Sequence, residues 1–494
     1  MMFVLKRENV QLLVLSLYFY LSFALCAGAQ SKPNILILAI DDLRPELACY
    51  GASHIHSPNV DRLAATSMQF DQAYAQQAVC LPSRISLFTG MRPNSTGVHD
   101  LQTKFRDTIP QAVTLPQHFS NNGYKTIGMG KVYHDEQWNE WSEWIDVKKY
   151  APLSTYHSKK NLELQKKLIS EAKQKGLKGR PYRRYVSGPA YEASSAAPER
   201  NYHDGAMTDL AIKALKAADD QPFFMVVGYK KPHLPFVAPQ KYWDLYDPKE
   251  IQLPDNYYPA KEAPSIAQMT WGELRAYSGI PAKGPVDTLT ARQLIRGYYA
   301  CVSFVDALIG RLLDALEEQG LDDNTIVVLW GDHGWKLGEH AMWCKHTNYE
   351  IDARVPLIIK VPNNGYPSGR SSALVELVDL YPTLCELTGL DIPSDCEGTS
   401  LVSLIKNPAA EWTEYAYSQY PRRGTIMGYS IKSKECRYTE WINEASGVIV
   451  AREYYDHVKD PKENKNVVKE ASYFSNINRL SALLNKQRNQ QYGF

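Results

Sequence analysis

The sequence has little cysteine, almost no net charge and no long apolar run beyond its first thirty residues. Its eight cysteines in 494 residues include no C-x-x-C pair, which argues against a zinc site built from cysteine thiolates. A formal net charge of +1 argues against a general nucleic-acid binder, whose surface would be strongly basic. No later segment is long and apolar enough to span a bilayer. These absences leave a large globular protein, with length for one large core and a smaller companion domain.

The first thirty residues have the layout of an export signal. Lys6 and Arg7 precede an apolar run, which ends at the small residues 27–29. This layout predicts a cleaved secretory signal over residues 1–29, although the run is also long enough for an uncleaved membrane anchor. We expect an exported protein without stable membrane insertion. It would be periplasmic or secreted, or lysosomal in a eukaryotic source.

Export changes the interpretation of the cysteines. Cleavage after residue 29 removes Cys26 and leaves seven: Cys49, Cys80, Cys301, Cys344, Cys385, Cys396 and Cys436. Seven is odd, so at least one thiol stays unpaired in an oxidising compartment. A short-loop disulfide between Cys385 and Cys396 is one option that the sequence leaves open.

Strand and helix patterns alternate along the first four hundred residues. Continuous apolar runs predict buried parallel strands at 34–40, 221–229 and 324–331. Ser57 and Pro58 are a candidate N-cap and first helical residue. Apolar spacing predicts another helix over 374–390, ending at Gly389. This order predicts an α/β fold with a mostly parallel sheet, whose ligands bind beyond the strand C-termini.

The pattern changes near Trp412. Short, aromatic, nearly alternating segments at 414–424, 426–442 and 446–458 predict antiparallel strands. A helical pattern over 476–491 follows them. We therefore expect a catalytic domain over 31–407 and a smaller α+β subdomain over 412–494.

One segment is unusually basic. Residues 159–184 contain ten Lys and Arg residues but only Glu163 and Glu171 as acids. Such a run is typical of a solvated helical face or an insertion. The alternative is a docking surface for a polyanion, which would raise the local substrate concentration at low salt.

Acidic residues stand directly after two of the predicted strands. Asp41 and Asp42 follow the first strand, and Asp332 and His333 follow the strand at 324–331. Adjacent carboxylates are costly to bury without a cation. Gathered at one sheet edge, they predict an oxygen-rich site for calcium or magnesium. The simpler alternative is that Asp41 and Asp42 only cap a turn.

Basic residues near other strand ends complement these acids: Lys131, His134, Lys230, Lys231, His233, Lys345 and His346. Each alone is typical of an ordinary surface or core position. Several of them beside a cation would form a pocket for an anionic ester. They would supply donors for its oxygens and an acid for its leaving group.

The stretch "CLPSRISLFTG" at 80–90 resembles the sulfatase signature C-x-P-S-R-x-x-x-L-T-G, with Phe88 as an apolar departure. The resemblance extends from Pro33 to the segment at 453–467. It is closest to the iduronate-2-sulfatase branch, on the strength of the stretches "GKVYH", "GYKKPHLPF", "GDHGWKLGEH", "LVELVDLYPTL" and "YSQYPR". It implies an alkaline-phosphatase-like fold with a large mixed, mostly parallel sheet.

The resemblance implies that Cys80 is not used as a thiol. In the family this cysteine is oxidised to formylglycine by a formylglycine-generating or sulfatase-maturating enzyme. One hydroxyl of the aldehyde hydrate attacks sulfur, and the other allows sulfate to leave. Pro82, Ser83 and Arg84 would form the recognition string of the modifying enzyme, and Arg84 would also hold the hydrate.

The remaining roles follow from the same resemblance. One calcium ion would be held by Asp41, Asp42, Asp332, His333 and the modified Cys80. Lys131 and His134 would orient the hydrate. His233 and Lys345 would bind sulfate and assist the departing sugar oxygen, while Cys344 and His346 would be packing residues. Trp335 would be either a sugar-stacking platform or a core residue.

The resemblance predicts hydrolysis of sulfate esters on a carbohydrate. A 2-O-sulfated uronate, or a similarly placed sulfate on a polysaccharide end, is the first hypothesis. Algal polysaccharides such as ulvan or carrageenan are alternatives to glycosaminoglycans as substrates. Two rivals remain. A phosphatase or phosphonate hydrolase of the same superfamily would use the same cation and basic residues, and a non-catalytic relative would bind carbohydrate only.

Overall fold

The computed structural model describes residues 32–134, 138–150, 154–362, 366–422 and 424–491. The predicted signal at 1–29 lies outside these residues. Within them, no helix combines the length and the apolar character that crossing a bilayer requires. All seven cysteines from Cys49 to Cys436 are free thiols here, including Cys385 and Cys396.

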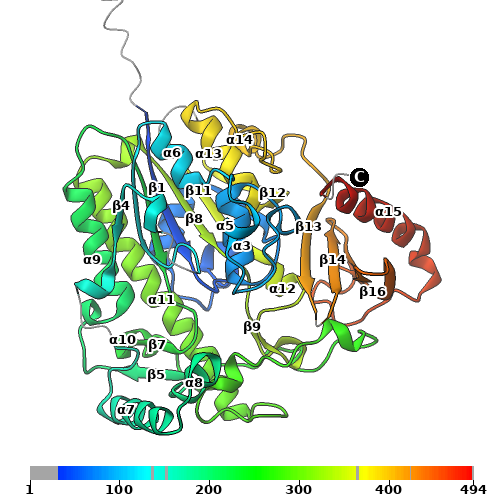
Figure 1. The fold of residues 1–494 in the computed structure, drawn as a ribbon, viewed down its shortest axis with the longest axis horizontal. Helices are drawn as coiled ribbons and strands as arrows, with labels where there is room; N and C mark the ends of the chain where they lie inside the picture. The colour runs from blue at the N-terminus through cyan, green and yellow to red at the C-terminus, as the bar shows by residue number, and fades with distance from the viewer. Residues whose placement is uncertain (1–31, 135–137, 151–153, 363–365, 423, 492–494) are drawn as a thin grey trace, which may run out of the picture. The chain divides into compact units, whose positions relative to one another are not determined.

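A sheet of eight strands forms the centre of the fold (Figure 1). Its strands in spatial order are β12 (Gly369–Glu376), β2 (Met68–Tyr74), β11 (Arg354–Lys360), β8 (Thr325–Gly331), β1 (Asn34–Ile40), β6 (Phe223–Tyr229), β3 (Lys125–Gly130) and β4 (Glu143–Ile145). Every pairing is parallel except the two made by β11. The predicted mixed, mostly parallel sheet is therefore confirmed.

The three predicted buried strands are β1, β6 and β8. Every residue in them is buried, which explains why each appears in the sequence as a continuous apolar run. Because β8, β1, β6 and β3 are parallel neighbours, their C-terminal ends lie at one edge of the sheet.

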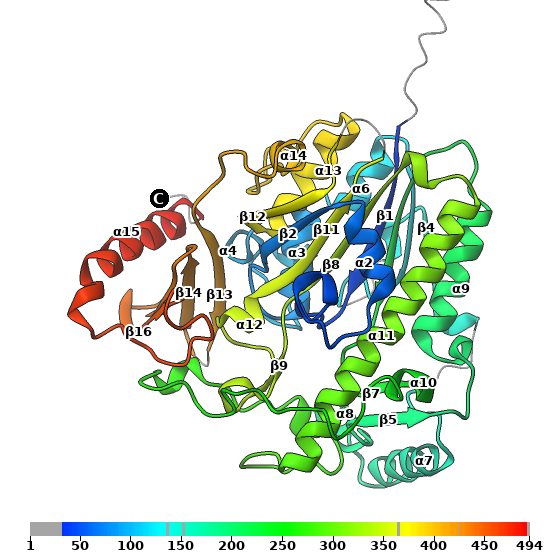
Figure 2. The same ribbon diagram turned by 180° about the vertical axis from the view of Figure 1, so that it is seen from behind.

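Helices cover both faces of this sheet. The even-numbered residues of β1 join a core under α2 (Pro58–Ala65), α9 (His203–Lys216) and α11 (Thr288–Glu318), which lie in front in Figure 2. The odd-numbered residues join a second core under α3 (Cys80–Thr89), α6 (Leu115–Asn121) and α13 (Leu380–Thr388). The alternation of side chains along a strand thus divides the core in two.

Two local predictions need correction. The segment 374–390 is not one helix: it completes β12 through Glu376, and α13 begins only at Leu380. Strand end and helix both face the same core, so their apolar residues merge into one helical-looking pattern. Ser57 does precede α2, but its side chain bonds the Ala48 N–H and Asp61 rather than capping the helix backbone.

The C-terminal antiparallel sheet is confirmed, but the predicted segment 426–442 is two strands rather than one. The strands β13 (Ala416–Pro421), β14 (Ile426–Lys432), β15 (Cys436–Asn443) and β16 (Val448–Asp456) form an antiparallel sheet in chain order. Ile477, Leu480 and Leu484 of α15 (Phe474–Gln491) pack on it. Residues Asn34–Phe494 cluster as one compact unit, so the boundary between 407 and 412 stays a prediction.

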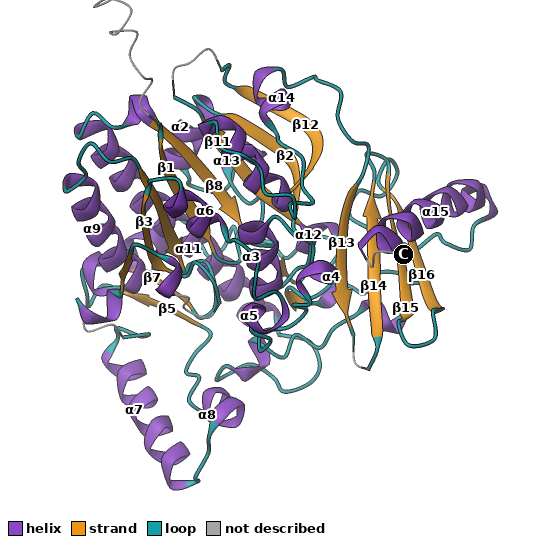
Figure 3. Cartoon of the chain, turned by 45° about the horizontal axis from the view of Figure 1, so that its top comes forward, coloured by secondary structure: helices purple, strands orange, loops and turns teal. Residues whose placement is uncertain are grey.

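The basic segment forms a pair of helices, α7 (Lys159–Gln174) and α8 (Gly179–Tyr185). They lie outside the layers of the large sheet (Figure 3). Along α7 only Ala172 is buried, so nearly all of its basic side chains face solvent.

Candidate active site

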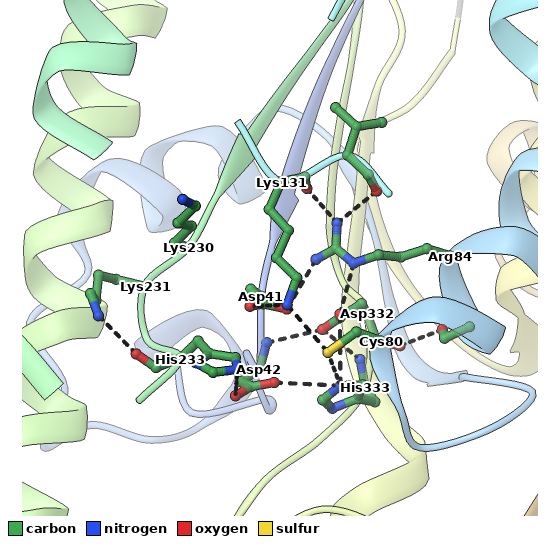
Figure 4. Close-up of polar contacts among 12 residues, drawn as sticks. Asp41, Asp42, Cys80, Arg84, Lys131, Lys230, Lys231, His233, Asp332 and His333 are labelled. Atoms are coloured by element: carbon green, nitrogen blue, oxygen red, sulfur yellow. Dashed lines mark hydrogen bonds and ion pairs between the residues drawn. The ribbon is translucent and has the colours of Figure 1, made fainter. Parts of the chain in front are cut away.

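Acidic residues from two adjacent strands meet at the C-terminal edge of the sheet. Ile40 and Gly331 are register partners at the ends of β1 and β8, so Asp41 and Asp42 come to lie beside Asp332 and His333 (Figure 4). The Asp42 N–H donates to Asp332 Oδ1 over 2.9 Å. Asp42 has a φ of 61°, a strained conformation for a non-glycine residue that is typical of functional sites.

Cys80 is brought to this edge by the start of α3. It is 2% exposed, and its Sγ lies 3.3 Å from His333 Nε2 and 3.3 Å from Lys131 Nζ. Ser83 fixes the helix by donating to the Asp332 carbonyl. Burial raises the pKa of the Cys80 thiol well above its ordinary value, and the charge of Asp41 raises it further. A thiol with such a pKa is a poor nucleophile.

Arg84 lies one helical turn beyond Cys80 and is fully buried. Its Nε donates to Asp332 Oδ2 over 2.9 Å, and its Nη2 lies 3.3 Å from Asp41 Oδ1. Its Nη1 bonds the carbonyls of Lys131 and Val132. Burial lowers the pKa of Arg84, but the charges of Asp332 and Asp41 more than offset this and raise it. The guanidinium therefore cross-links the two acidic strand ends and the end of β3.

Lys131 follows β3 and contacts both Asp41 and Cys80. Its Nζ lies 2.5 Å from Asp41 Oδ2. A close approach of β3 and β6 makes this possible, because a Cβ on Gly130 would lie 2.3 Å from the Gly228 carbonyl oxygen. His134, three residues later, is exposed, in contrast to the buried residues around Cys80. Its predicted role remains a prediction.

His233 and Lys345 add a second group of cations. Lys345 Nζ lies 3.0 Å from Asp42 Oδ1, and His233 Nε2 lies 3.9 Å from Asp42 Oδ2. The residues on either side of Lys345 have φ values of 68° and 87°, so a strained backbone holds this lysine in place. Of the predicted basic residues, Lys131, His233 and Lys345 lie beside the acids.

Glu273 is a member of the site that sequence reasoning missed. Its carboxylate lies 3.1 Å from both His233 Nε2 and Lys345 Nζ, and 3.5 Å from His346 Nε2. Burial raises the pKa of Glu273, but Lys345 and the neighbouring histidines more than offset this and hold it well below the ordinary value.

His346 also bonds the Tyr420 hydroxyl over 2.7 Å, so it is more than a packing residue.

Trp335 is a core residue rather than a sugar platform. It is 1% exposed, and its ring packs edge-on against Phe236 at 6.3 Å between centroids. Lys345 Nζ lies 4.7 Å from its ring centroid. Cys344 is fully buried, as expected of a packing residue.

The acidic residues fit a hard divalent cation. Asp41, Asp42 and Asp332 are at most 1% exposed, and ligand atoms of these acids, Cys80 and His333 fall into groups within 4.8 Å. His333 Nδ1 lies 2.9 Å from the Gly334 carbonyl, which is an acceptor for a proton on Nδ1, and Nε2 faces Cys80 at 3.3 Å, where it could be a ligand atom. Burial raises the pKa of Asp42 despite nearby Lys345, so the cluster lacks full charge compensation from the protein alone.

A cavity of about 470 Å³ opens beside this cluster. Its lining includes Asp41, Lys131 and His233, together with Lys148, His157, His203, Asp204, Lys230 and Lys231. A partly open cavity of this size, rich in basic side chains, suits an anionic small molecule or sugar unit.

Two family models match the chain. The model described as Sulfatase matches residues 33–390, and the model described as N-sulphoglucosamine sulphohydrolase, C-terminal, matches residues 338–490. The first spans the large sheet and every site residue described above, and the second spans the four-stranded sheet.

Among curated proteins, mouse (Mus musculus) iduronate 2-sulfatase is 33% identical over 524 residues, covering 90% of this chain and 92% of the relative. Among solved structures, a protein in complex with its substrate D-glucosamine-2-N,6-O-disulfate has a TM-score of 0.73 at 25% identity, covering 94% and 98% of the two chains. The phosphonate monoester hydrolase of Agrobacterium radiobacter has a TM-score of 0.71 at 21% identity, covering 93% and 96%. The last likeness concerns the fold alone.

Proposed function

The chain belongs to the sulfatase family and has its alkaline-phosphatase-like fold, and from this premise we propose that it removes sulfate from a 2-O-sulfated uronate or a related sulfated sugar through a formylglycine made from Cys80. The observation that carries the proposal is the place of Cys80 between Lys131 and His333, at the edge that also holds three buried carboxylates.

Two groups would be added to the chain. One calcium ion would be held by Asp41, Asp42, Asp332, His333 and the modified Cys80. The ion would supply charge that polarises a sulfate oxygen and lowers the pKa of the attacking hydroxyl. The formylglycine hydrate would supply that hydroxyl and the means of sulfate release. The high thiol pKa of Cys80 supports a role other than thiolate attack.

The residues of the chain have separable tasks. Lys131 would orient the modified side chain, which lies within reach of its ammonium group. Lys345 would bind a sulfate oxygen. His233 would protonate the departing sugar oxygen, because its Nδ1 faces the Leu234 carbonyl at 2.6 Å and its Nε2 faces Glu273 at 3.1 Å. Two acceptors favour a doubly protonated ring, and the charges of Asp42 and Asp41 raise the pKa of His233 despite its burial.

The test combines mass spectrometry with an assay of sulfate release. Protein produced together with a sulfatase-maturating enzyme should show formylglycine in the peptide that contains Cys80, and it should release sulfate from 2-O-sulfated uronate oligosaccharides. Cys80→Ala should abolish release. An unmodified thiol in active protein, or activity that survives Cys80→Ala, would contradict the mechanism.

Substrate choice is tested with defined sulfated oligosaccharides and with phosphate esters of the same alcohols. We expect the highest kcat/KM for a sulfate at position 2 of a uronate. A higher kcat/KM for ulvan or carrageenan fragments would show that one of these is the preferred substrate instead of a uronate 2-sulfate. A higher kcat/KM for phosphate esters would contradict the proposed sulfatase activity.

A further inference from the structure

The active-site cavity extends beyond the reacting groups to Lys230. The ammonium group of this lysine lies in a partly buried place without a partner of opposite charge among the residues that the structure describes. The lysine is partly buried and lines the cavity, and within the described residues no hydrogen bond or ion pair reaches its Nζ (Figure 4). In the figure its side chain points away from Cys80. A partly buried ammonium without a counter-charge is costly.

The nearest acid is already engaged. The Asp204 carboxylate accepts the backbone N–H groups of Lys230 and Lys231 over 3.0 and 2.8 Å, and it lies 3.0 Å from His203 Nδ1. It thus supports the turn after β6 and makes no ion pair with the Lys230 ammonium. Burial lowers the pKa of Lys230, and the charges of neighbouring lysines lower it further against the opposing effect of Asp204.

Two other lysines of the cavity, Lys131 and Lys231, have different tasks. Lys131 pairs with Asp41, and Lys231 Nζ donates to the carbonyls of His233 and Pro235 over 2.9 and 2.6 Å. Both are therefore held in place by the protein. Lys230 is the lysine of these three whose donors remain available to a ligand.

We propose that Lys230 forms a second anion subsite, which binds a carboxylate or a second sulfate of the substrate while the first sulfate lies at Cys80. This inference rests on the proposed function and adds a requirement to it. Asp41 and Lys131, which lie beside Cys80, line the same cavity as Lys230. A substrate that occupies both ends of this cavity would therefore carry at least two anionic groups. Charged hydrogen bonds to such a group would supply both affinity and orientation.

The test compares three substrates: a sulfated uronate, a neutral sugar with two sulfates, and an aryl sulfate with a single anionic group. In Lys230→Gln, kcat/KM for a dianionic substrate should fall about 10- to 100-fold more than for the aryl sulfate, the range expected for one charged hydrogen bond. Lys230→Arg should keep most of the preference. The exposed Lys216 on α9 gives a matched control, since Lys216→Gln should leave all three rates unchanged.

The first two substrates distinguish a carboxylate subsite from a sulfate subsite. Equal losses on all three substrates, or no loss, would overturn the inference while leaving the sulfatase assignment intact. Absence of sulfate release by the wild type from every substrate would instead refute the proposed function.

Binding provides a second measurement that does not depend on turnover. Cys80→Ala and Cys80→Ala/Lys230→Gln proteins are titrated calorimetrically with the disulfated sugar. A dissociation constant raised about tenfold or more by the second substitution supports the subsite, and an unchanged constant contradicts it. Far-ultraviolet circular dichroism confirms that both proteins are folded.

Discussion

At the scale of single residues, the candidate site is a balance of buried charges. Asp332, Asp41 and Asp42 each form an ion pair, with Arg84, Lys131 and Lys345 respectively, although these cations do not fully offset the burial of Asp42. One further acid, Glu273, contacts His233 and Lys345. Each charge is fixed by a partner, so the arrangement is preorganised before substrate arrives.

Glu273→Gln tests this arrangement on the substrate side. The hydrogen bond to Glu273 raises the pKa of His233. Without the carboxylate, less of His233 would carry the proton, so sugar leaving groups that need protonation should be expelled more slowly. We expect kcat for a sugar sulfate to fall about 10- to 100-fold, with a much smaller loss for an aryl sulfate whose leaving group needs little protonation. Glu250→Gln, at an exposed position of the same long segment, is the control. Equal losses on both substrates would argue against help to the leaving group.

Removal of the metal tests the acidic side. Chelation should lower the melting temperature and abolish sulfate release, because three buried carboxylates would lose their cation. Added calcium should restore both. Asp42→Asn should remove most of the thermal shift caused by calcium, whereas Asp314→Asn, at an exposed site on α11, should keep it. Differential scanning calorimetry with and without calcium measures the shift, and a melting temperature insensitive to calcium in the wild type would refute the metal site.

At the scale of elements, the strand ends were predictable and the long connections were not. Asp41 and Asp332 could be placed together from the sequence, because parallel neighbouring strands end at one edge. Glu273 could not, because it lies in a long segment between β7 (Phe236–Pro239) and α11 whose described elements are only short helical turns of three or four residues. Only the folded chain shows that this segment returns to His233. The buried position of Trp335 was equally invisible, because an aromatic residue beside a site suits either stacking or packing.

The C-terminal sheet contains a buried acid with a measurable pH signature. Glu453 on β16 accepts from Trp441 Nε1 over 2.7 Å and from Tyr455 Oη over 2.6 Å. Burial raises its pKa to about 7. The folded protein therefore binds a proton between pH 4.5 and 7 that the unfolded chain has released, and stability falls as pH rises through this window.

Glu453→Gln should remove this part of the pH dependence while keeping one acceptor oxygen; the lost second acceptor affects stability equally at both pH values and cancels in the comparison. From pH 5 to pH 8, the wild type should lose about 2–3 kcal/mol of unfolding free energy relative to the variant. Urea unfolding at the two values measures the difference. Glu435→Gln, in the exposed turn before β15, should behave like the wild type. Parallel pH dependence in wild type and Glu453→Gln would show that the carboxyl titrates normally.

At the scale of the whole molecule, charge is unevenly placed although the net charge is only +1. The helices α7 and α8 present exposed basic side chains, and the segment just before α7 supplies His157 to the active-site cavity. A polyanion bound along α7 would therefore contact a helix that begins two residues after a residue of the cavity wall.

Neutralising this surface should affect long substrates alone. We expect the triple variant Lys166→Gln, Lys173→Gln, Lys178→Gln to lower kcat/KM severalfold on a sulfated polysaccharide at low salt, with the difference vanishing near 0.5 M salt, where charges are screened within about 5 Å. A disaccharide should be hydrolysed at the wild-type rate. The triple variant Lys213→Gln, Lys216→Gln, Lys406→Gln changes the same charge at exposed positions elsewhere. A loss of equal size in that control would mean that only net charge matters.

The burial of α3 has a consequence for the order of events during synthesis. Every residue from Cys80 to Thr89 is buried in the folded chain, so Leu81, Pro82, Ser83 and Arg84 are out of reach of any other protein once the sheet has closed over them. A modifying enzyme that reads these side chains must act on the nascent chain, before β8 and β11 are in place some 250 residues later. If Cys80 is converted as proposed, conversion would compete with folding, and conditions that speed folding should leave more of the protein unconverted.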